Sequence, residues 1–549
     1  MLPSQMLEQW EKLTPQRVYL RQPIDGVWND YTWEQCAQEV RRMAGALQAM
    51  DLPPASHIAI LSKNCAHWFL ADFAIWMAGH VSIPIYPNLS ASAIRSILEH
   101  SESCLMFVGK LDDWSDIKTV IPPDLHCISF PYGSPGEYPS WAAIASANNP
   151  ISKAVSRSAS DLATIIYTSG TTGEPKGVMH TFGSITFSTE NIAKELDFNA
   201  SDRFFSYLPL AHVAERLVVE MLSLYSGGTV SFAQSLDTFL ANLQDTQPTI
   251  FLGVPRIWEK LQAGVLQKIP QKKLDRLLTV PILSSLIGYK IRKGLGLNKM
   301  RLGVTGAAPT PDALKKWYLK IGLELQDGYG MTENFAYSHL ARKGRSRMGW
   351  IGEPFRQVEA RISPVGEILV KSGATMAGYY KAPELTADTI NNSFLHTGDR
   401  GEIDSEGFLK ISGRIKDIFK TSKGKYVAPA AIEIELAACP LLECVCVIGS
   451  GLPQPVVLVV LSQAGLQKDR ATMTSELALL LEKINRALSP HERLSKMVVV
   501  KTAWTIQNQF LTPTMKLRRS TVEQHYHVQL HKWMSCKDTI VWESDFAAR

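Results

Sequence analysis

The segment that most constrains this chain is TIIYTSGTTGEPKGVMHT, at residues 164–181. Its first residues are apolar and have the composition of a buried strand. Glycines and hydroxyl residues follow at once, so the amides and hydroxyls there would stay unpaired unless an external group filled them. A phosphate meets that need, because glycine lets amides approach closely and a lysine adds positive charge. The candidate donors are Thr168, Ser169, Gly170, Thr171, Thr172, Gly173 and Lys176.

This loop is not a Walker motif. A Walker loop has four residues between its first glycine and a Gly-Lys-Ser/Thr triplet, whereas Lys176 is followed by Gly177. A P-loop fold is therefore disfavoured. Taken alone, a loop rich in serine, threonine and glycine is more often a plain turn than a nucleotide site, so the interpretation depends on other segments of the chain.

The length of the chain predicts more than one domain. With 549 residues, of which 45% are hydrophobic and 20% charged, the composition is globular but the chain is too long for one core. Helical patterns such as residues 33–50 alternate with short apolar runs. These runs lie at 57–61, 104–109, 163–168, 249–253 and 300–306. The alternation predicts a layered α/β architecture with mostly parallel sheets.

The character of the sequence changes after Lys410. Residues 411–429 are charged, contain glycine and end in proline, as expected of an exposed junction. Beyond it lie strand candidates at 444–449, 456–462 and 497–501 and an amphipathic helix near 475–488. We therefore expect a large N-terminal domain over 1–413 and a small α+β domain over 414–549.

Bulk charge and cysteine usage exclude several classes of protein. The formal net charge is only +5, and no basic block is interleaved with aromatic residues, so no nucleic-acid partner is expected. The eight cysteines have no CxxC pair and no zinc-like spacing, as is typical of reduced cysteines. The N-terminus lacks a signal pattern, and prolines break the longest uncharged run, 73–94. We expect a cytoplasmic protein without a membrane span.

One segment, residues 268–301, is locally basic. Its only acid is Asp275, and its interior cations are Lys272, Lys273, Arg276, Lys290, Arg292, Lys293 and Lys299. A solvated helical face is one interpretation of this composition, and a patch that touches anionic lipid headgroups is the other. In the second case the protein would associate peripherally with membranes.

The order YTSGTTGEPKG, at 167–177, resembles the phosphate-binding signature of the adenylate-forming superfamily, which includes acyl-coenzyme A synthetases, luciferases and peptide synthetase adenylation domains. Further segments fall in the family's order between about residue 30 and about residue 520, and they read LPLAHVAER, VTGAAP, DGYGMTE, HTGD and SGRIKD. The resemblance implies the adenylate-forming fold, with a large adenylation domain and a small mobile C-terminal domain. It also implies two linked acyl transfers, first to AMP and then to a thiol.

The resemblance assigns roles to individual residues. On the nucleotide side the matched positions are Gly306, Ala307 and Ala308 facing adenine, Asp327, Gly328 and Tyr329 flanking the base, Thr332 at the phosphates, and Asp399 with Arg414 at the ribose. Glu333, with Thr168, would hold Mg²⁺, and His212 would lie beside the acyl and coenzyme tunnel. Carboxylates suit a ribose diol and a hard cation, and an arginine can donate two hydrogen bonds at once. For His212, a satisfied core histidine is an equally good interpretation.

Near the C-terminus, FLTPTMKLRR contains Lys516, which the resemblance makes the catalytic lysine that bridges carboxylate and phosphate oxygens. Because Lys516 lies in the small domain, adenylation requires the two domains to close. The resemblance places the hinge for their later rotation at Lys416. The surface that rotation would bring in includes Lys423 and Gly424, which would meet coenzyme A.

The segments GVPRIWEKL, at 253–261, and SKGKYVAP, at 422–429, resemble long-chain acyl-coenzyme A synthetases. The implied substrates are a fatty acid, ATP with Mg²⁺, and coenzyme A. Two alternatives stay open: a ligase that delivers the acyl group to a carrier protein, and a non-catalytic binding protein on the same fold. Lys516 speaks against the second, because a binding protein has no need of a lysine on a mobile domain. The oligomeric state is not specified by the sequence.

Overall fold

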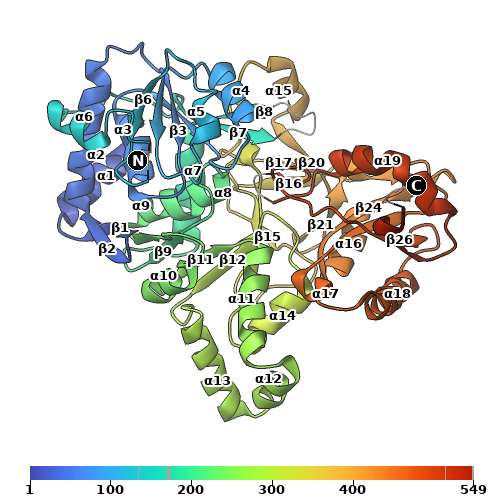
Figure 1. The fold of residues 1–549 in the computed structure, drawn as a ribbon. Helices are drawn as coiled ribbons and strands as arrows, with labels where there is room; N and C mark the ends of the chain where they lie inside the picture. Colours follow the sequence, from blue (N-terminus) through green and yellow to red (C-terminus); the bar gives the residue numbers. More distant parts are fainter. Residues whose placement is uncertain (134, 170–174, 513–514, 547–549) are drawn as a thin grey trace.

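The structure, a computed structural model, describes residues 1–133, 135–169, 175–512 and 515–546 (Figure 1). The chain forms a large α/β domain followed by a smaller α+β domain, which confirms the predicted fold class. The three sheets of the large domain end with Arg414, and two further sheets are formed only by later residues.

The first sheet has nine strands in the order β15-β14-β13-β12-β11-β9-β10-β1-β2. Its strands are β1 Val18–Ile24, β2 Val27–Thr32, β9 Arg203–Ser206, β10 Thr229–Phe232, β11 Ile250–Gly253, β12 Leu302–Gly306, β13 Leu325–Tyr329, β14 His339–Leu340 and β15 Glu353–Pro354. From β13 to β1 all neighbours are parallel, and the antiparallel pairs lie at the two edges.

The second sheet has seven strands in the order β18-β8-β7-β4-β3-β5-β6. Its strands are β3 His57–Leu61, β4 Val81–Ile85, β5 Leu105–Val108, β6 His126–Ser129, β7 Leu162–Ser169, β8 Pro175–Thr181 and β18 Gly378–Tyr379. The sheet is parallel from β7 to β6, but β8 returns antiparallel to β7 and β18 pairs antiparallel with β8.

The third sheet differs from the expectation of mostly parallel pairing, because all its pairs are antiparallel. Its strands are β16 Glu359–Ile362, β17 Glu367–Lys371, β19 Ile390–Asn391, β20 Phe394–Ile403 and β21 Leu409–Arg414. Only one face of β20 and β17 is buried, so these strands lack the continuous apolar runs that predict parallel strands.

Helices cover the sheets of the large domain (Figure 1). They are α1 Pro3–Leu13, α2 Trp33–Ala49, α3 Ala66–Met77, α4 Ala91–Ser101, α5 Ser115–Lys118, α6 Trp141–Ala147, α7 Phe182–Glu195, α8 Val213–Glu215, η1 Arg216–Met221, α9 Leu222–Ser226, α10 Phe239–Thr246, α11 Pro255–Lys268, α12 Gln271–Leu278, α13 Pro281–Gly294, α14 Asp312–Lys320, η2 Thr332–Asn334 and α15 Pro383–Thr389. All residues of α3 are buried, and one apolar core joins this helix to strands of both large sheets. Within the described part of the chain, no helix combines the length and apolar character needed to cross a bilayer.

The small domain is built on a four-stranded sheet and a two-stranded hairpin. Its elements are η3 Ile415–Asp417, β22 Phe419–Lys420, β23 Tyr426–Val427, α16 Pro429–Ala437, β24 Leu442–Ile448, β25 Val456–Leu461, α17 Gln463–Leu466, α18 Arg470–Ala487, β26 Lys496–Val499, α19 Arg519–Ser535, β27 Ile540–Trp542 and η4 Glu543–Phe546. Strand β25 alternates its side chains between two apolar cores, one with α16 and α18 and the other with α19. Both faces of this sheet are therefore covered by helices.

A buried charge cluster ties the core of the large domain together. Arg216 begins the π-helical turn η1, and its guanidinium contacts the carboxylate of Asp72 on α3. The same guanidinium lies 3.2 Å from Glu220 and donates a 2.7 Å hydrogen bond to Thr164 on β7. Burial raises the pKa of both carboxyl groups, and that of Glu220 rises well above its usual value.

We expect Arg216→Met to lower the free energy of unfolding by about 3–5 kcal/mol, because the two acidic groups would lose their buried cation. The change is measured as a fall in the thermal unfolding midpoint. Arg361→Met is the matched control: its ion pair with Glu359 is exposed, so its loss is expected to cost less than about 1 kcal/mol. Equal midpoints for the two variants would contradict the role assigned to the cluster.

Candidate active site

The phosphate-loop segment leaves the second sheet as the hairpin β7–β8. Thr168 pairs with Lys176 across the hairpin, and Ser169 pairs with Pro175. The chain therefore returns beside the strand it left. The predicted donors Gly170, Thr171, Thr172 and Gly173 lie outside the described residues.

Strand β8 brings the hairpin against the predicted magnesium segment. Lys176 Nζ lies 5.7 Å from the centre of the Tyr379 ring, and the Tyr379 hydroxyl donates a 2.7 Å hydrogen bond to Glu333 Oε1. His180 Nε2 donates to the carbonyl oxygen of Thr332 at 2.6 Å. Burial lowers the pKa of His180 to about 4, so the imidazole is neutral near pH 7. Two residues that the sequence did not single out, Tyr379 and His180, thus position the Thr332–Glu333 turn.

The predicted adenine segments lie at the ends of two adjacent strands. Gly306 on β12 pairs with Gly328 on β13. A Cβ atom added at Gly306 would lie 2.6 Å from the carbonyl oxygen of Gly328, so only glycine fits there without a backbone shift. Ala307 follows with φ +64°, and Ala308 is exposed. The chain therefore turns sharply at the end of β12, where a flat ligand could reach the backbone.

Asp327 has a buried ion pair instead of a free carboxylate. Lys315 Nζ lies 2.7 Å from Asp327 Oδ2 and 2.9 Å from Asp312 Oδ1. Burial raises the pKa of Asp327, and the neighbouring lysine acts in the opposite direction. A ligand at this position would therefore meet the backbone of β13 more readily than the Asp327 side chain. Lys315 had no signal in the sequence beyond its place on an amphipathic helix.

Asp399 is held by side chains from two different sheets. Arg414 Nε donates to Asp399 Oδ1 at 3.0 Å, across the β20–β21 pair. The Tyr329 hydroxyl, at the end of β13, donates to Asp399 Oδ2 at 2.8 Å. Burial lowers the pKa of Arg414, but Asp399, Asp417 and Glu333 together raise it above its usual value. Both ribose-site candidates are thus oriented before any ligand arrives.

The small domain contributes Lys516, whose pKa responds to the charges of Arg414, Asp399 and Glu333. Its main chain closes a turn with Thr512, through a 2.7 Å bond from the Thr512 amide to the Lys516 carbonyl. The residue as a whole is exposed, while desolvation of its ammonium group lowers the pKa of Lys516, as does the charge of Arg414. Asp399 and Glu333 act on the same ammonium in the opposite direction. Residues from both domains therefore share one electrostatic site.

His212 lies within the electrostatic reach of Lys516. Burial is the main cause that lowers the pKa of His212 to about 3, and the Lys516 charge adds to it. Its Nδ1 accepts a 3.1 Å hydrogen bond from the Ala214 amide, so His212 caps the short helix α8. The imidazole is therefore neutral near pH 7, with Nε2 as its remaining polar atom.

The predicted hinge and coenzyme residues lie between the domains and on the small domain. Lys416 is the middle residue of η3, two residues beyond Arg414, where β21 ends. Lys423 and Gly424 form the exposed β22–β23 turn, in which Gly424 has φ +77°. The Gly424 amide bonds to the carbonyl of Thr421, so the turn is a formed structure.

A metal ion here would need ligands beyond the protein. Among the described residues, no group of three or more His, Cys, Asp or Glu side chains is arranged to hold one. Glu333 offers a single carboxylate, and Thr168 lies half-buried at the end of β7. Mg²⁺ is commonly held by one or two carboxylates together with phosphate oxygens and water. The residues present therefore fit a magnesium ion that arrives with a nucleotide.

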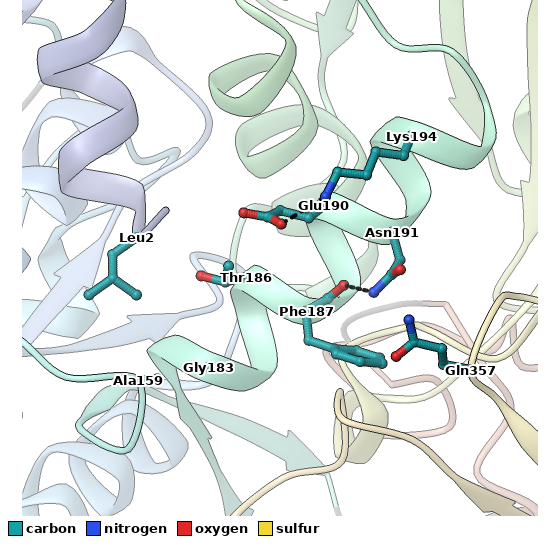
Figure 2. A pocket seen from close by; sticks show the side chains of 9 residues that line it. All are labelled: Leu2, Ala159, Gly183, Thr186, Phe187, Glu190, Asn191, Lys194 and Gln357. Atoms are coloured by element: carbon teal, nitrogen blue, oxygen red, sulfur yellow. Dashed lines mark hydrogen bonds and ion pairs between the residues drawn. The ribbon is translucent and has the colours of Figure 1, made fainter.

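An open hollow of about 400 Å³ runs along α7, and the residues that line it are drawn in Figure 2. Its walls include Phe187, Gln357 and the ion pair of Glu190 with Lys194, at 3.1 Å. The hollow contains none of the predicted site residues, so the site described above does not depend on it.

Comparisons with known proteins agree with this arrangement. The family model described as AMP-binding enzyme matches residues 7–380, and the model for the AMP-binding enzyme C-terminal domain matches residues 416–535. The chain belongs to the AMP-binding enzyme family. This membership confirms the resemblance to the adenylate-forming superfamily.

Within this family the curated relatives include fatty-acid–CoA ligases. A long-chain-fatty-acid–CoA ligase of Mycobacterium bovis is 27% identical over 95% of each chain. A long-chain acyl-CoA synthetase of Arabidopsis thaliana is 29% identical over 95% of this chain and 91% of its own. A putative fatty-acid–CoA ligase of Mycobacterium tuberculosis is 30% identical over 68% of this chain and 73% of its own.

Two solved structures have the same fold as this chain. An anthranilate CoA ligase in complex with anthranoyl-AMP has a TM-score of 0.79 at 20% identity, over 97% of this chain and 98% of its own. The o-succinylbenzoate coenzyme A synthetase of Bacillus subtilis, in complex with ATP and magnesium ion, has a TM-score of 0.73 at 23% identity, over 94% and 99%.

We expect Gly306→Ala to weaken nucleotide binding at least about tenfold, because the added Cβ would force β12 away from the Gly328 carbonyl. Titration calorimetry with ATP and with AMP measures the effect. The matched control is Gly264→Ala in α11, where an added Cβ meets nothing within 4 Å. That control should keep wild-type affinity, and an unchanged affinity in Gly306→Ala would contradict the assignment of this turn.

Proposed function

We propose that this protein is an AMP-forming long-chain fatty acid–CoA ligase. It activates the fatty acid with ATP to an acyl adenylate, with release of pyrophosphate, and then transfers the acyl group to coenzyme A, giving acyl-CoA and AMP. The observation that carries the proposal is the hydrogen-bonded pair of carboxylates in a member of the AMP-binding enzyme family: Asp399 accepts from Arg414 and Tyr329, and Glu333 accepts from Tyr379. The charges of these two carboxylates also act on the pKa of Lys516 in the small domain. Two separate domains then meet at one reaction centre.

In this proposal the large domain holds the nucleotide. The β7–β8 loop binds the phosphates, with Lys176 at its base, and the turn after Gly306 faces adenine. Asp399 accepts hydrogen bonds from the ribose hydroxyls, and its existing bonds to Tyr329 and Arg414 fix its orientation. Because the Asp399 carboxylate is already oriented, little reorganisation of this residue is needed when ATP binds.

Glu333 and Thr168 would hold Mg²⁺ together with the phosphates of ATP. When bound, the ion neutralises charge on the phosphates and favours departure of pyrophosphate. The hydroxyl of Tyr379 keeps Glu333 in place through its 2.7 Å hydrogen bond. Tyr379 is therefore a positioning residue for the metal ligand.

The first step brings two anions together. An oxygen of the fatty acid carboxylate attacks the α-phosphorus, and the bond from that phosphorus to the bridging oxygen of pyrophosphate breaks. Lys516 supplies positive charge where the carboxylate and phosphate oxygens meet. Burial and the charge of Arg414 lower the pKa of this ammonium, while Asp399 and Glu333 act in the opposite direction and favour its charged form.

The second step requires Lys516 to leave. The thiol of coenzyme A attacks the acyl carbonyl, the carbon–oxygen bond to AMP breaks, and the thiol proton passes to solvent or to the released phosphate. We propose that rotation about Lys416 moves Lys516 out and brings Lys423 and Gly424 to the coenzyme. His212, neutral near pH 7, borders the acyl end without adding a second charge there.

The preference for a long acyl chain is supported by the relatives and by the chain's own segments at 253–261 and 422–429. An apolar tunnel gains about 0.8 kcal/mol for each buried methylene, so affinity should rise with chain length until the tunnel is filled.

We further propose that the boundary between the large and the small domain lies between residues 413 and 414. Peripheral contact with an anionic membrane would give the protein access to its substrate.

The proposal is tested by pyrophosphate release across carboxylic acids of graded chain length, followed by thioester formation with coenzyme A or with a carrier protein. We expect a preference for long-chain acids and for free coenzyme A. Lys516→Ala should reduce adenylate formation roughly 100- to 1,000-fold, while Lys532→Ala, on the exposed face of α19, should not. Near-normal adenylation by Lys516→Ala would refute the proposed site.

The hinge is tested by Lys416→Pro. Residue 416 lies in a 3-10 turn, and the φ that proline imposes, near −65°, suits that conformation. The variant should therefore keep the arrangement with Lys516 at the site and resist rotation. We expect thioester formation to fall at least about tenfold more than adenylate formation, while Lys416→Ala keeps both. Equal losses in the two half-reactions would exclude the hinge.

A further inference from the structure

The helical hairpin α12–α13 projects from the end of the large domain, below the nine-stranded sheet (Figure 1). Its inner side is firmly anchored. Leu274 of α12 and Ile291 of α13 belong to the same apolar core as Trp258 of α11 and Tyr318 of α14. A Cβ added at Gly288 would lie 3.0 Å from the carbonyl oxygen of Ile321, so α13 packs closely on the end of α14. The hairpin is therefore a fixed platform.

The outer side of α13 is apolar where a surface helix is normally polar. Among the described residues, twenty large apolar side chains are exposed, and five of them lie within residues 280–289. Ile282 is 80% exposed and Leu286 is 56% exposed. With Tyr289 they occupy positions i, i+4 and i+7, which lie on one helical face. Val280 and Leu283 complete the patch.

The two helices of the hairpin also carry exposed basic side chains. The exposed cations of the hairpin are Lys272, Lys273, Arg276, Lys290 and Lys293. Within the described part of the chain, no carboxylate lies within ion-pair distance of any of these five. The one acid of the hairpin, Asp275, is engaged by Lys320 at 2.8 Å. The cations are thus available to an external anion.

Charge complementarity identifies the occupant of this surface. A second copy of the chain would bring another set of lysines against the first, and like charges repel. An anionic bilayer can bind both kinds of side chain, because its phosphate groups attract the lysines and its acyl region, just below them, accepts the apolar residues. Aromatic and long basic side chains are also favoured at that boundary.

We propose that the α12–α13 hairpin docks the protein on an anionic phospholipid membrane. The side chains of Ile282, Leu286 and Tyr289 enter the headgroup region, and the exposed lysines of the hairpin contact lipid phosphates. The benefit to the enzyme rests on the proposed function, since long-chain fatty acids partition into membranes. Lipid binding itself does not depend on the proposed function, because the docking surface lies outside the nucleotide site.

The experiment is co-sedimentation of the full chain with vesicles of equal parts phosphatidylcholine and phosphatidylglycerol, and with vesicles of pure phosphatidylcholine. The wild-type chain should bind the anionic vesicles and bind less as salt is added. The double variant Ile282→Ser/Leu286→Ser should lower the partition coefficient at least about tenfold. Lys290→Gln/Lys293→Gln should lower it about fivefold for each charge removed.

The matched control is Leu479→Ser/Val528→Ser, which removes two exposed apolar side chains from α18 and α19 of the small domain. This variant should bind vesicles like the wild-type chain. Equal binding to neutral and anionic vesicles, no binding to either, or equal losses in the hairpin and control variants would overturn the proposal. Self-association abolished by Ile282→Ser/Leu286→Ser, without vesicle binding, would also overturn it and assign the surface to a second copy.

Adenylate formation with a water-soluble short-chain acid is measured on the same variants. All of them should retain it, because none of the changed residues lies at the proposed active site. Loss of vesicle binding with retained adenylation separates a failure of this inference from a failure of the proposed function.

Discussion

The carboxylate of Asp399 is the point on which the arrangement of the two domains depends. It accepts from Arg414, the last residue of the third sheet, and from Tyr329, at the end of a strand of the first. Because Arg414 precedes the turn that leads into the small domain, this ion pair fixes where the chain leaves the large domain. The charge of the pair also reaches Lys516, a residue about a hundred positions further along the chain. The proposed site shared by the two domains is therefore organised around one buried carboxylate, that of Asp399.

Each of the three sheets of the large domain contributes residues to the proposed site. Parallel strands of the first sheet end together, which places the turn after Gly306 beside Gly328. The second sheet contributes a hairpin, and its short strand β18 carries Tyr379 to Glu333. The third sheet contributes Asp399. Polar groups that would be costly to bury alone satisfy one another here, so the site is largely organised before a ligand binds.

The same domain also supports a second surface of a different kind. Helix α11 begins two residues after β11 ends, and it leads directly into the α12–α13 hairpin. The hairpin's inner side joins the apolar core beneath the first sheet, while its outer side keeps apolar and basic groups exposed. One rigid scaffold thus connects the nucleotide-binding strands with the proposed membrane-docking surface, and neither requires the other to form.

The sequence by itself determined the family, the α/β class, the strands with continuous apolar runs, and the residue types at the site, because these depend on local composition and on motifs in a fixed order. The strand at 57–61, the helix at 33–50 and the strand pair after residue 440 are confirmed. The structure alone decided the antiparallel third sheet and the roles of Tyr379, His180 and Lys315. Each of these is a contact between residues far apart in the chain, and no local pattern specifies which distant partner a side chain will meet. The exposed face of α13 belongs with them, because an apolar residue in a sequence does not state whether the fold will cover it.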